Sequence, residues 1–316
     1  MAPTNYKYIY GPVASRRLGL SLGVDIVPFK HCSFNCIYCQ VGKTTHLDLT
    51  RQALVPIENV LKEITDNTSR NESIDYITFS GSGEPTLHSE LGILIQRLRS
   101  KTSIPVAVLT NSSLIDRADV QRDLSHASVV APTLCSTRDD TYMRIHRAHK
   151  SIKVSTIIEG LISFRKSYSG AIWLEIMMIN GLNDTEEEIR SMKEVISRIQ
   201  PDKVHLNTVV RPPLESSVSS VSPEMLERAR NIIGDRAEII VTQQKNPARL
   251  AHRNAVSRIL DIIQRRPSTI EDIAAVSGIE PVELSGQLTR LIEQGKVRKH
   301  RHQDNVFYEI APREEA

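Results

Sequence analysis

The sequence predicts an α/β fold in which a parallel sheet is covered by helices. Apolar, β-branched runs typical of buried strands recur at 22–28, 74–80, 105–109, 127–134, 172–179, 203–210 and 237–241. Helical patterns lie between them at 56–69, 88–100, 116–125, 138–166, 184–199 and 222–234. Six or seven strands alternating with helices suit a barrel or partial barrel, which carries its chemistry at the C-terminal ends of the strands.

The pattern changes near residue 250, so we expect two domains, 1–250 and 251–316. Three amphipathic helices and a two-stranded hairpin follow, at 253–267, 268–278, 281–295 and 296–310. Ser268 and Gly278 are the expected caps of the second helix, and Asp304-Asn305 is the expected hairpin turn. Three helices followed by a wing predict a small winged-helix-like α+β domain.

Composition is that of an ordinary globular protein, with 40% hydrophobic and 24% charged residues. The net charge of +3 is too small to imply a polyanionic partner by itself. No run of 18 apolar residues occurs, and the N-terminus lacks the apolar core of a signal peptide. We therefore expect a cytoplasmic protein, in which a cysteine cluster is metal-binding or catalytic.

The stretch KHCSFNCIYCQVG, residues 30–42, holds Cys32, Cys36 and Cys39, three of the chain's 4 cysteines. Structural zinc takes four ligands, so a zinc site would need Cys135 as well, because His31 adjoins Cys32 and neighbours seldom ligate one ion together. A [4Fe–4S] cluster held by three thiolates instead leaves one iron open to a substrate or cofactor.

CSFNCIYC resembles the CxxxCxxC signature of radical S-adenosylmethionine (SAM) enzymes, with the usual aromatic residue, Tyr38, before the third cysteine. The resemblance implies that Cys32, Cys36 and Cys39 hold the cluster and that the methionine end of SAM chelates the open iron. Reduction then cleaves SAM to a 5′-deoxyadenosyl radical, which abstracts hydrogen from the substrate. It also implies a partial (β/α)6 TIM-like barrel.

A second resemblance is the segment Gly81, Ser82, Gly83 and Glu84, which is similar to the family's glycine-glycine-glutamate segment that binds the SAM amino group. Glycines let a ligand approach the backbone, and a carboxylate accepts hydrogen bonds from an ammonium. The alternative is an ordinary turn that ends a strand at Pro85.

Three further SAM contacts follow from the family's pattern, each with a plainer alternative. Asn111 and Thr133 match polar contacts to the methionine carboxylate and the ribose, but Asn111 also suits an Asx-turn and Thr133 an ordinary strand position. Met177 could pack on adenine or simply on the core.

Residues 8–32 resemble one branch of the family, which includes archaeal enzymes that build wybutosine in tRNA. Arg16 and Arg17 in this segment could meet an anionic substrate group or form a structural pair. Enzymes of that branch need three further cysteines for a second cluster, and this chain has only Cys135 besides the first three. We therefore expect the fold and SAM chemistry to carry over, but not the wybutosine activity.

Cys135 ends the fourth strand in PTLCST, where its side chain could face the barrel mouth. A thiol there could donate a hydrogen atom to a substrate radical or bond to the substrate. The alternative is a small buried hydrophobe.

The resemblance predicts an enzyme with one [4Fe–4S] cluster, SAM and a flavodoxin- or ferredoxin-type electron donor. Its substrate could be a peptide or protein, an RNA base or an anionic metabolite, and the C-terminal domain could dock a macromolecular substrate. The other hypothesis is a winged-helix transcription regulator with an iron–sulfur sensor, although a sensor has no use for Gly81–Glu84 or an open iron.

Overall fold

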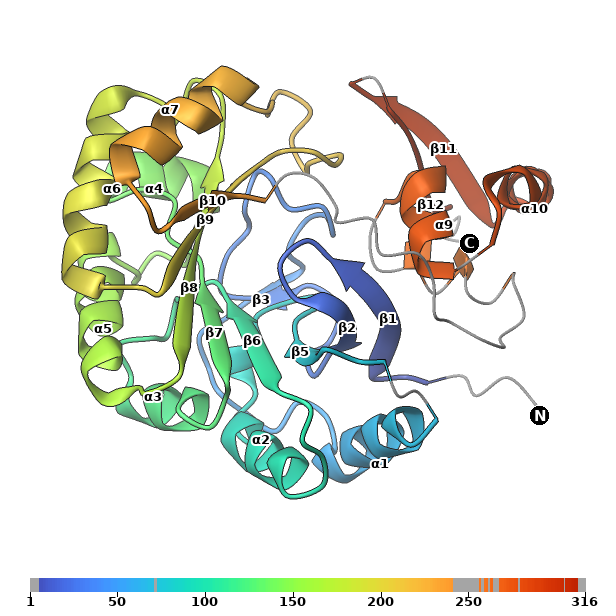
Figure 1. The fold of residues 1–316 in the computed structure, drawn as a ribbon, viewed down its shortest axis with the longest axis horizontal. Helices are drawn as coiled ribbons and strands as arrows, with labels where there is room; N and C mark the ends of the chain where they lie inside the picture. The colour runs from blue at the N-terminus through green and yellow to red at the C-terminus, as the bar shows by residue number, and fades with distance from the viewer. Residues whose placement is uncertain are drawn as a thin grey trace.

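The protein is built around one sheet of eight strands, in the order β1-β2-β5-β6-β7-β8-β9-β10 (Figure 1). The computed structural model describes residues 6–70, 73–240, 256, 259–260, 262–263, 267–277, 279–303 and 305–311. The strands are β1 Ile9–Ser15, β2 Gly19–Val24, β5 Tyr76–Phe79, β6 Val106–Thr110, β7 Val129–Pro132, β8 Ala171–Met178, β9 Lys203–Thr208 and β10 Ala237–Ile239. All are parallel from β2 to β10, whereas β1 is antiparallel to β2.

Helices alternate with these strands and lie outside the sheet, which confirms the predicted partial TIM-like barrel (Figure 1). They are α1 Ile57–Thr68, α2 Leu91–Arg99, α3 Ala118–Leu124, α4 Asp139–His146, α5 Val154–Ser167, α6 Glu186–Ile199 and α7 Pro223–Ile233. In the described ranges β1 and β10 do not pair, so the barrel stays open between them. No helix among the described residues is long and apolar enough to cross a bilayer.

Two elements differ from the sequence prediction. Strand β1 was not expected, and the helix predicted over 138–166 is two helices, α4 and α5. Helix α4 stops at Arg147, which adopts a left-handed conformation with φ 42. The last carbonyls of α4 do not continue the helix because the cysteine loop uses them: Asn35 N–H donates to the His146 carbonyl and Ile37 N–H to the Ile145 carbonyl, both at 3.0 Å. The end of α4 therefore holds the cysteine loop.

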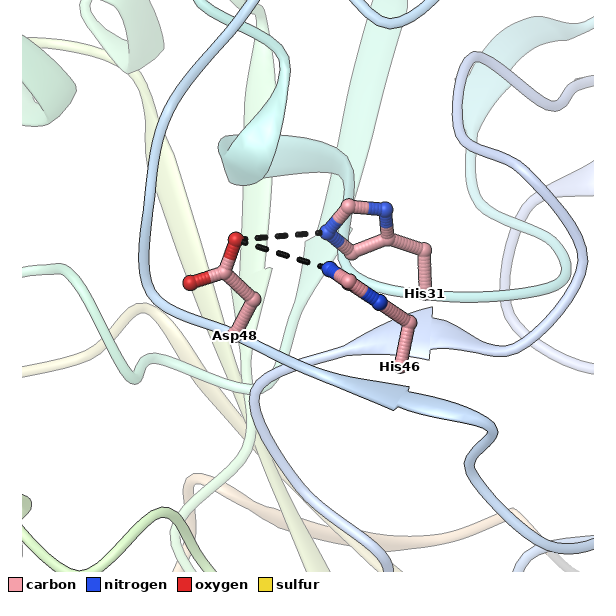
Figure 2. Close-up of side chains that lie close together, drawn as sticks. All are labelled: His31, His46 and Asp48. Carbon is pink, nitrogen blue, oxygen red and sulfur yellow. Dashed lines mark ion pairs between the residues drawn. The ribbon is translucent and has the colours of Figure 1, made fainter.

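A second, very short parallel pair lies beside the cysteine loop. Strand β3, His31–Cys32, pairs with β4, His46–Leu47, and this register sets His31 against His46 (Figure 2). The pair fixes the backbone at Cys32, because Asp48 N–H also donates to the Cys32 carbonyl at 3.2 Å.

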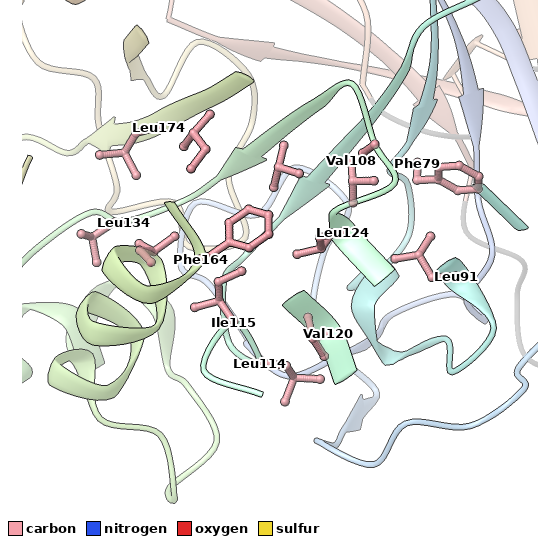
Figure 3. Packing of buried hydrophobic residues seen from close by; sticks show 14 of the residues in the cluster. Phe79, Leu91, Val108, Leu114, Ile115, Val120, Leu124, Leu134, Phe164 and Leu174 are labelled. Atoms are coloured by element: carbon pink, nitrogen blue, oxygen red, sulfur yellow. The ribbon is translucent and has the colours of Figure 1, made fainter. Parts of the chain in front are cut away.

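The main core lies between the sheet and the outer helices (Figure 3). Side chains of the strands, such as Phe79, Val108 and Leu174, pack there against Leu91, Leu124 and Phe164 of the helices. Burial alternates along β8, and its odd-numbered residues from Trp173 to Met177 point to the other side of the sheet. This alternation directs Glu175 into the barrel interior.

The C-terminal part contains α9 Ile270–Ser277, α10 Pro281–Glu293 and an antiparallel hairpin of β11 Val297–His302 and β12 Asn305–Ile310. The order helix, helix, hairpin agrees with the sequence prediction. Most of the expected first helix, the boundary at 250/251, Gly278 and Asp304 lie outside the described residues. The winged-helix assignment therefore stays a prediction.

The N-cap predicted at Ser268 is wrong by one residue. The Ser268 backbone bridges to Tyr308 of β12, so it cannot begin the helix. Thr269 caps α9 instead, because its hydroxyl accepts from Asp272 N–H at 3.1 Å.

The C-terminal part packs on the edge strand of the barrel (Figure 1). Ala14 of β1 is buried in one cluster with Ile263, Ile273 and Leu284. Arg211, which follows β9, pairs with Asp272 of α9 at 3.3 Å. The two parts therefore meet beside the C-terminal ends of the barrel strands.

Candidate active site

A cleft of about 350 Å³ opens at the C-terminal ends of the strands. This volume suits a small-molecule ligand. Among the residues singled out from the sequence, the cleft lining includes Arg16, Arg17, Cys32, Cys36, Gly81, Gly83, Glu84, Asn111 and Thr133. Cys39, Tyr38, Ser82, Met177 and Cys135 are not part of this lining.

Each thiol of the cysteine loop has a polar neighbour from a different part of the chain. Lys30 Nζ donates to Cys39 Sγ at 3.1 Å, and His146 Nδ1 lies 3.3 Å from Cys36 Sγ. Asn111 Nδ2 lies 3.5 Å from Cys32 Sγ. Such contacts can adjust the charge on sulfur, which tunes a metal centre.

The three thiols are close enough to influence one another's ionisation. Burial, with Glu84 and Cys39 nearby, raises the pKa of Cys32 to about 12. Burial and the charges of Cys32 and Cys39 also raise the pKa of Cys36 well above its usual value. Thiolates crowded into a buried loop need a compensating positive charge, and a bound metal centre supplies one.

The loop of residues 81–84 requires glycine at two positions, where its backbone lies too close to neighbouring atoms for a Cβ to fit. A Cβ on Gly81, which has φ +144, would lie 2.5 Å from Asp25 Cγ, and one on Gly83 would lie 1.9 Å from the His31 carbonyl oxygen. Ser82 ties the loop to Asp25, because its hydroxyl donates to Asp25 Oδ2 at 2.5 Å. The backbone of this loop is thus pressed against the segment that carries the cysteines.

Glu84 is 2% exposed and is held by four hydrogen bonds. Oε1 accepts from Thr86 N–H, Thr86 Oγ1 and Thr110 Oγ1 at 2.7–3.0 Å. Oε2 accepts from Asn111 N–H at 2.7 Å. Burial nevertheless raises the pKa of Glu84, so a cationic group in the cleft would stabilise its charged form.

Asn111 has the Asx-turn that the sequence left open, with Oδ1 accepting from Ser113 N–H at 2.9 Å. Its Nδ2 group also donates to Ser33 Oγ at 2.8 Å. Thr133 extends β7 by a single bridge to Glu175. Both residues line the cleft. We call Gly81, Gly83, Glu84 and Asn111 the glycine wall.

A second group of residues in the cleft lining carries three arginines and a glutamate. Arg17 pairs with Glu175 at 2.8 Å, and Arg16 donates to Asn207 Oδ1 at 2.8 Å. Burial opposes ionisation of Glu175, but Arg17 and a hydrogen bond from Asn207 hold its pKa below its usual value. Nε of Arg17 and Nε of Arg211 are buried without a hydrogen-bond partner. We call Arg16, Arg17, Glu175 and Arg211 the arginine wall.

Cys135 is 1% exposed and lies in an apolar cluster with Ile37, Ile145 and Ile179. Tyr38 and Met177 pack against the same cluster. Burial raises the pKa of Cys135 to about 12. This packing is that of the small buried hydrophobe, the alternative that the sequence left open for Cys135.

Sequence reasoning missed several residues of the site. Lys30 and Asp25 flank the cysteine and glycine loops, and His146 belongs to a helix whose end was not predicted. Burial lowers the pKa of His146 to about 3, so the ring that faces Cys36 is neutral at ordinary pH. Arg211 follows β9, so the general rule for strand ends was the signal available for it. Glu175 lies within β8, where the alternation of buried and less buried residues along the strand was the available signal.

The comparisons with known proteins agree with this fold. A family model described as the radical SAM superfamily matches residues 26–192. The UPF0026 protein MJ1312 of Methanocaldococcus jannaschii is 33% identical over 314 residues, which cover 95% of this chain and 94% of that protein. A crystal structure of a radical SAM methyltransferase from Sphaerobacter thermophilus has a TM-score of 0.55 at 17% identity, covering 69% of this chain and 65% of that chain.

A longer relative, named GTPase Obg, of Brachyspira hyodysenteriae is 34% identical over 296 residues, which cover 93% of this chain. The chain spans only 44% of the length of that relative, so its name describes the longer protein. The chain belongs to the radical SAM superfamily, an enzyme class whose cofactors are SAM and a [4Fe–4S] cluster, and within it to the UPF0026 family.

Proposed function

We propose that the protein reductively cleaves SAM at a single [4Fe–4S] cluster held by Cys32, Cys36 and Cys39, and that it acts on a substrate with an anionic group. One observation carries the proposal: two cysteine side chains, the glycine wall and the arginine wall line the same cleft. When bound there, cluster and SAM supply a 5′-deoxyadenosyl radical that abstracts hydrogen from the substrate.

The residues present fit these cofactors. Three thiols on one loop match a cluster with one open iron, and Cys135 is buried among apolar residues next to that loop. Glu84, whose pKa is raised by burial, suits the ammonium group of SAM, because ion pairing would offset the desolvation of its carboxylate. Ser82 takes a positioning role here, because its hydroxyl is bonded to Asp25.

Asn111 and Thr133 are assigned to the polar end of SAM because both line the cleft. Asn111 contacts Cys32 Sγ and the loop of residues 81–84 together, so it orients both. Tyr38 and Met177 lie in the apolar cluster beside the cleft and are assigned to packing around the cofactors.

The substrate class follows from the arginine wall. The ion pair of Arg17 with Glu175 leaves Arg17 Nε without a hydrogen-bond partner. Arg211 Nε also has no hydrogen-bond partner. A carboxylate or phosphate would accept from these buried donors in a charge-assisted geometry. An anionic metabolite, or a macromolecule that presents such a group, therefore fits better than a neutral substrate.

A macromolecular substrate would reach the cleft past the C-terminal part. Ile262 lines the cleft, and Gln303 of the hairpin donates to the Val209 carbonyl at 3.3 Å. We assign substrate docking to this part, and reduction to a flavodoxin- or ferredoxin-type donor. The Arg16–Arg17 segment resembles the wybutosine branch of the family, but this chain lacks the cysteines for the second cluster of that branch.

The regulator hypothesis gains nothing from the matched family. A regulator would bind a defined DNA duplex with a steep dependence on salt and would leave SAM intact. The enzyme and the regulator are thus separated by one measurement, the fate of SAM.

The test is anaerobic reconstitution with iron and sulfide, followed by dithionite reduction and measurement of 5′-deoxyadenosine. Cys32→Ala, Cys36→Ala and Cys39→Ala should each abolish SAM cleavage. The matched control is Cys135→Ala, which should retain it because Cys135 is not one of the three cysteines of the loop and is buried among apolar residues. A fully loaded cluster that leaves SAM intact would refute the proposal.

A further inference from the structure

Three side chains outside the cleft lining converge on one point beside the cysteine loop (Figure 2). They are His31 of β3, His46 of β4 and Asp48, which follows β4. One ligand atom from each lies within 4.8 Å of the others. We call these three residues the histidine triad.

The backbone builds this arrangement. The parallel pairing of His31 with His46 places the two rings side by side, with centroids 4.4 Å apart. Asp48 Oδ1 accepts from Leu49 N–H, Thr50 N–H and Thr50 Oγ1 at 2.7–3.0 Å. These bonds fix the carboxylate so that its other oxygen, Oδ2, faces the two imidazoles (Figure 2).

The distances do not describe a completed set of hydrogen bonds. Nε2 of His31 and Nε2 of His46 each lie 3.8 Å from Asp48 Oδ2, which is too long for a hydrogen bond. His31 is 5% exposed, and its Nε2 atom is buried with no hydrogen-bond partner. A buried imidazole nitrogen aimed at a fixed carboxylate therefore needs something between them.

We propose that the histidine triad is a second metal site, which binds a divalent transition ion of the zinc or ferrous type through His31 Nε2, His46 Nε2 and Asp48 Oδ2. Two imidazoles and one carboxylate are a recurrent donor set for these ions. Ligand bonds of about 2.1 Å separate neighbouring ligand atoms by roughly 3.0–3.5 Å. Closing each 3.8 Å separation takes roughly 0.3–0.8 Å. The exposed His46 ring can supply its share, and small rotations of the His31 ring and the Asp48 carboxylate would close the other pair.

The position of the site suggests what the ion does. His31 precedes Cys32, and the His31 carbonyl accepts from Glu84 N–H at 3.2 Å. An ion bridging β3 and β4 would therefore clamp the segment that joins the cysteine loop to the glycine wall. Three protein ligands also leave at least one coordination position for water or another ligand.

The test uses untagged full-length protein with its cluster loaded and Zn²⁺ as the probe. Dialysis followed by elemental analysis should find one zinc per chain beyond the cluster iron. His46→Ala and Asp48→Asn should each weaken zinc binding by about tenfold or more. Asn keeps an oxygen for the turn at Thr50 but presents an amide nitrogen to the rings. His126→Ala, which removes a distant histidine paired with Gln96, is the matched control and should bind zinc normally.

The cysteines are the competing ligands, so a second arm removes them. In a Cys32→Ser, Cys36→Ser, Cys39→Ser variant, zinc binding should persist, and X-ray absorption should show nitrogen and oxygen neighbours without sulfur. Zinc that is absent from the loaded protein, that survives His46→Ala, or that is lost with the cysteines would overturn the proposal. None of these results depends on whether SAM is cleaved.

Discussion

The two walls of the cleft differ in how completely they satisfy their own polar groups. On the glycine wall, Glu84 accepts four hydrogen bonds and Asn111 uses both ends of its amide. On the arginine wall, buried Nε atoms of Arg17 and Arg211 have no hydrogen-bond partner. Side chains whose hydrogen bonds are satisfied within the protein are held in one geometry, which suits a ligand that is the same in every reaction cycle. Donors without a partner can instead bind a ligand that supplies the acceptors.

The largest effect should come from Gly83→Ala, which changes a residue of the glycine wall. Its Cβ would lie 1.9 Å from the His31 carbonyl oxygen, and backbone cannot yield cheaply. We expect a loss of about 3 kcal/mol in the free energy of unfolding and a reduced iron content. Gly286→Ala, in α10 with nothing within 4 Å, is the control and should stabilise by about 0.5–1 kcal/mol. Equal stability of the two variants in denaturant titrations would contradict the account of the glycine wall.

Next comes Glu84→Gln, which keeps the shape of the side chain but removes its charge. The amide places an –NH2 group against an N–H group that had donated a hydrogen bond to the carboxylate. We expect the free energy of unfolding to fall by about 2.5 kcal/mol. SAM should also bind more weakly, because no carboxylate remains for its ammonium. Equilibrium dialysis and chemical unfolding measure the two effects, with exposed Glu58→Gln as control. Unchanged SAM affinity would remove Glu84 from the SAM site.

Beneath the arginine wall, His205 should make stability depend on pH. Burial, with Arg17 nearby, lowers the pKa of His205 from 6.5 to about 4, so the folded state keeps the ring neutral. Between these values the unfolded chain binds the extra proton, so this stability is complete above pH 6.5 and is lost as pH falls toward 4. We expect a loss of about 2 kcal/mol from pH 7 to pH 5. His205→Gln should flatten that part of the curve in urea unfolding, and an identical pH dependence would show that other groups cause it.

The smallest effect should be that of Arg211→Met on anion binding. Loss of one charge-assisted donor should weaken binding of inorganic phosphate about tenfold, as measured by calorimetry. SAM cleavage without substrate should not change, because the glycine wall is untouched. Arg198→Met, which breaks an exposed pair with Glu159, is the control. If Arg211→Met binds phosphate as tightly as the unchanged protein, the arginine wall does not bind anions through Arg211.

The sequence predicted the barrel well because strand and helix periodicities differ and the strands are buried. It placed the cysteines, residues 81–84 and Asn111 at strand ends, where the structure has them. It did not predict β1, because a strand interrupted by Gly11 and Pro12 lacks a continuous apolar run. The break between α4 and α5 was also hidden, since it depends on hydrogen bonds from a loop more than 100 residues earlier.

The site was predictable only where a motif carried it. Asn111 and His146 reach the sulfur atoms of Cys32 and Cys36 from 79 and 110 residues further along the chain, so no local pattern predicts these contacts. Lys30, which contacts Cys39, lies in the segment of the motif itself but was not recognised from the sequence. Cys135 shows a different limit of the sequence, because a strand end predicts the edge of the sheet but not which of the two alternatives holds, a side chain that faces the cleft or one buried in the packing beside it. The histidine triad likewise required the β3–β4 register, which two-residue strands do not reveal in sequence.

The packing of the C-terminal part on β1 has a consequence for how the barrel avoids association with itself. An open sheet ends in a strand whose backbone can recruit a strand from another chain, and β1 is such an edge. Ala14 lies under the isoleucines and leucines of the C-terminal part, so this part shields the edge as well as adjoining the cleft. Cutting the chain before it would expose apolar surface beside unpaired backbone, and aggregation of the shortened protein would reflect that exposed edge and not a failure of the barrel to fold.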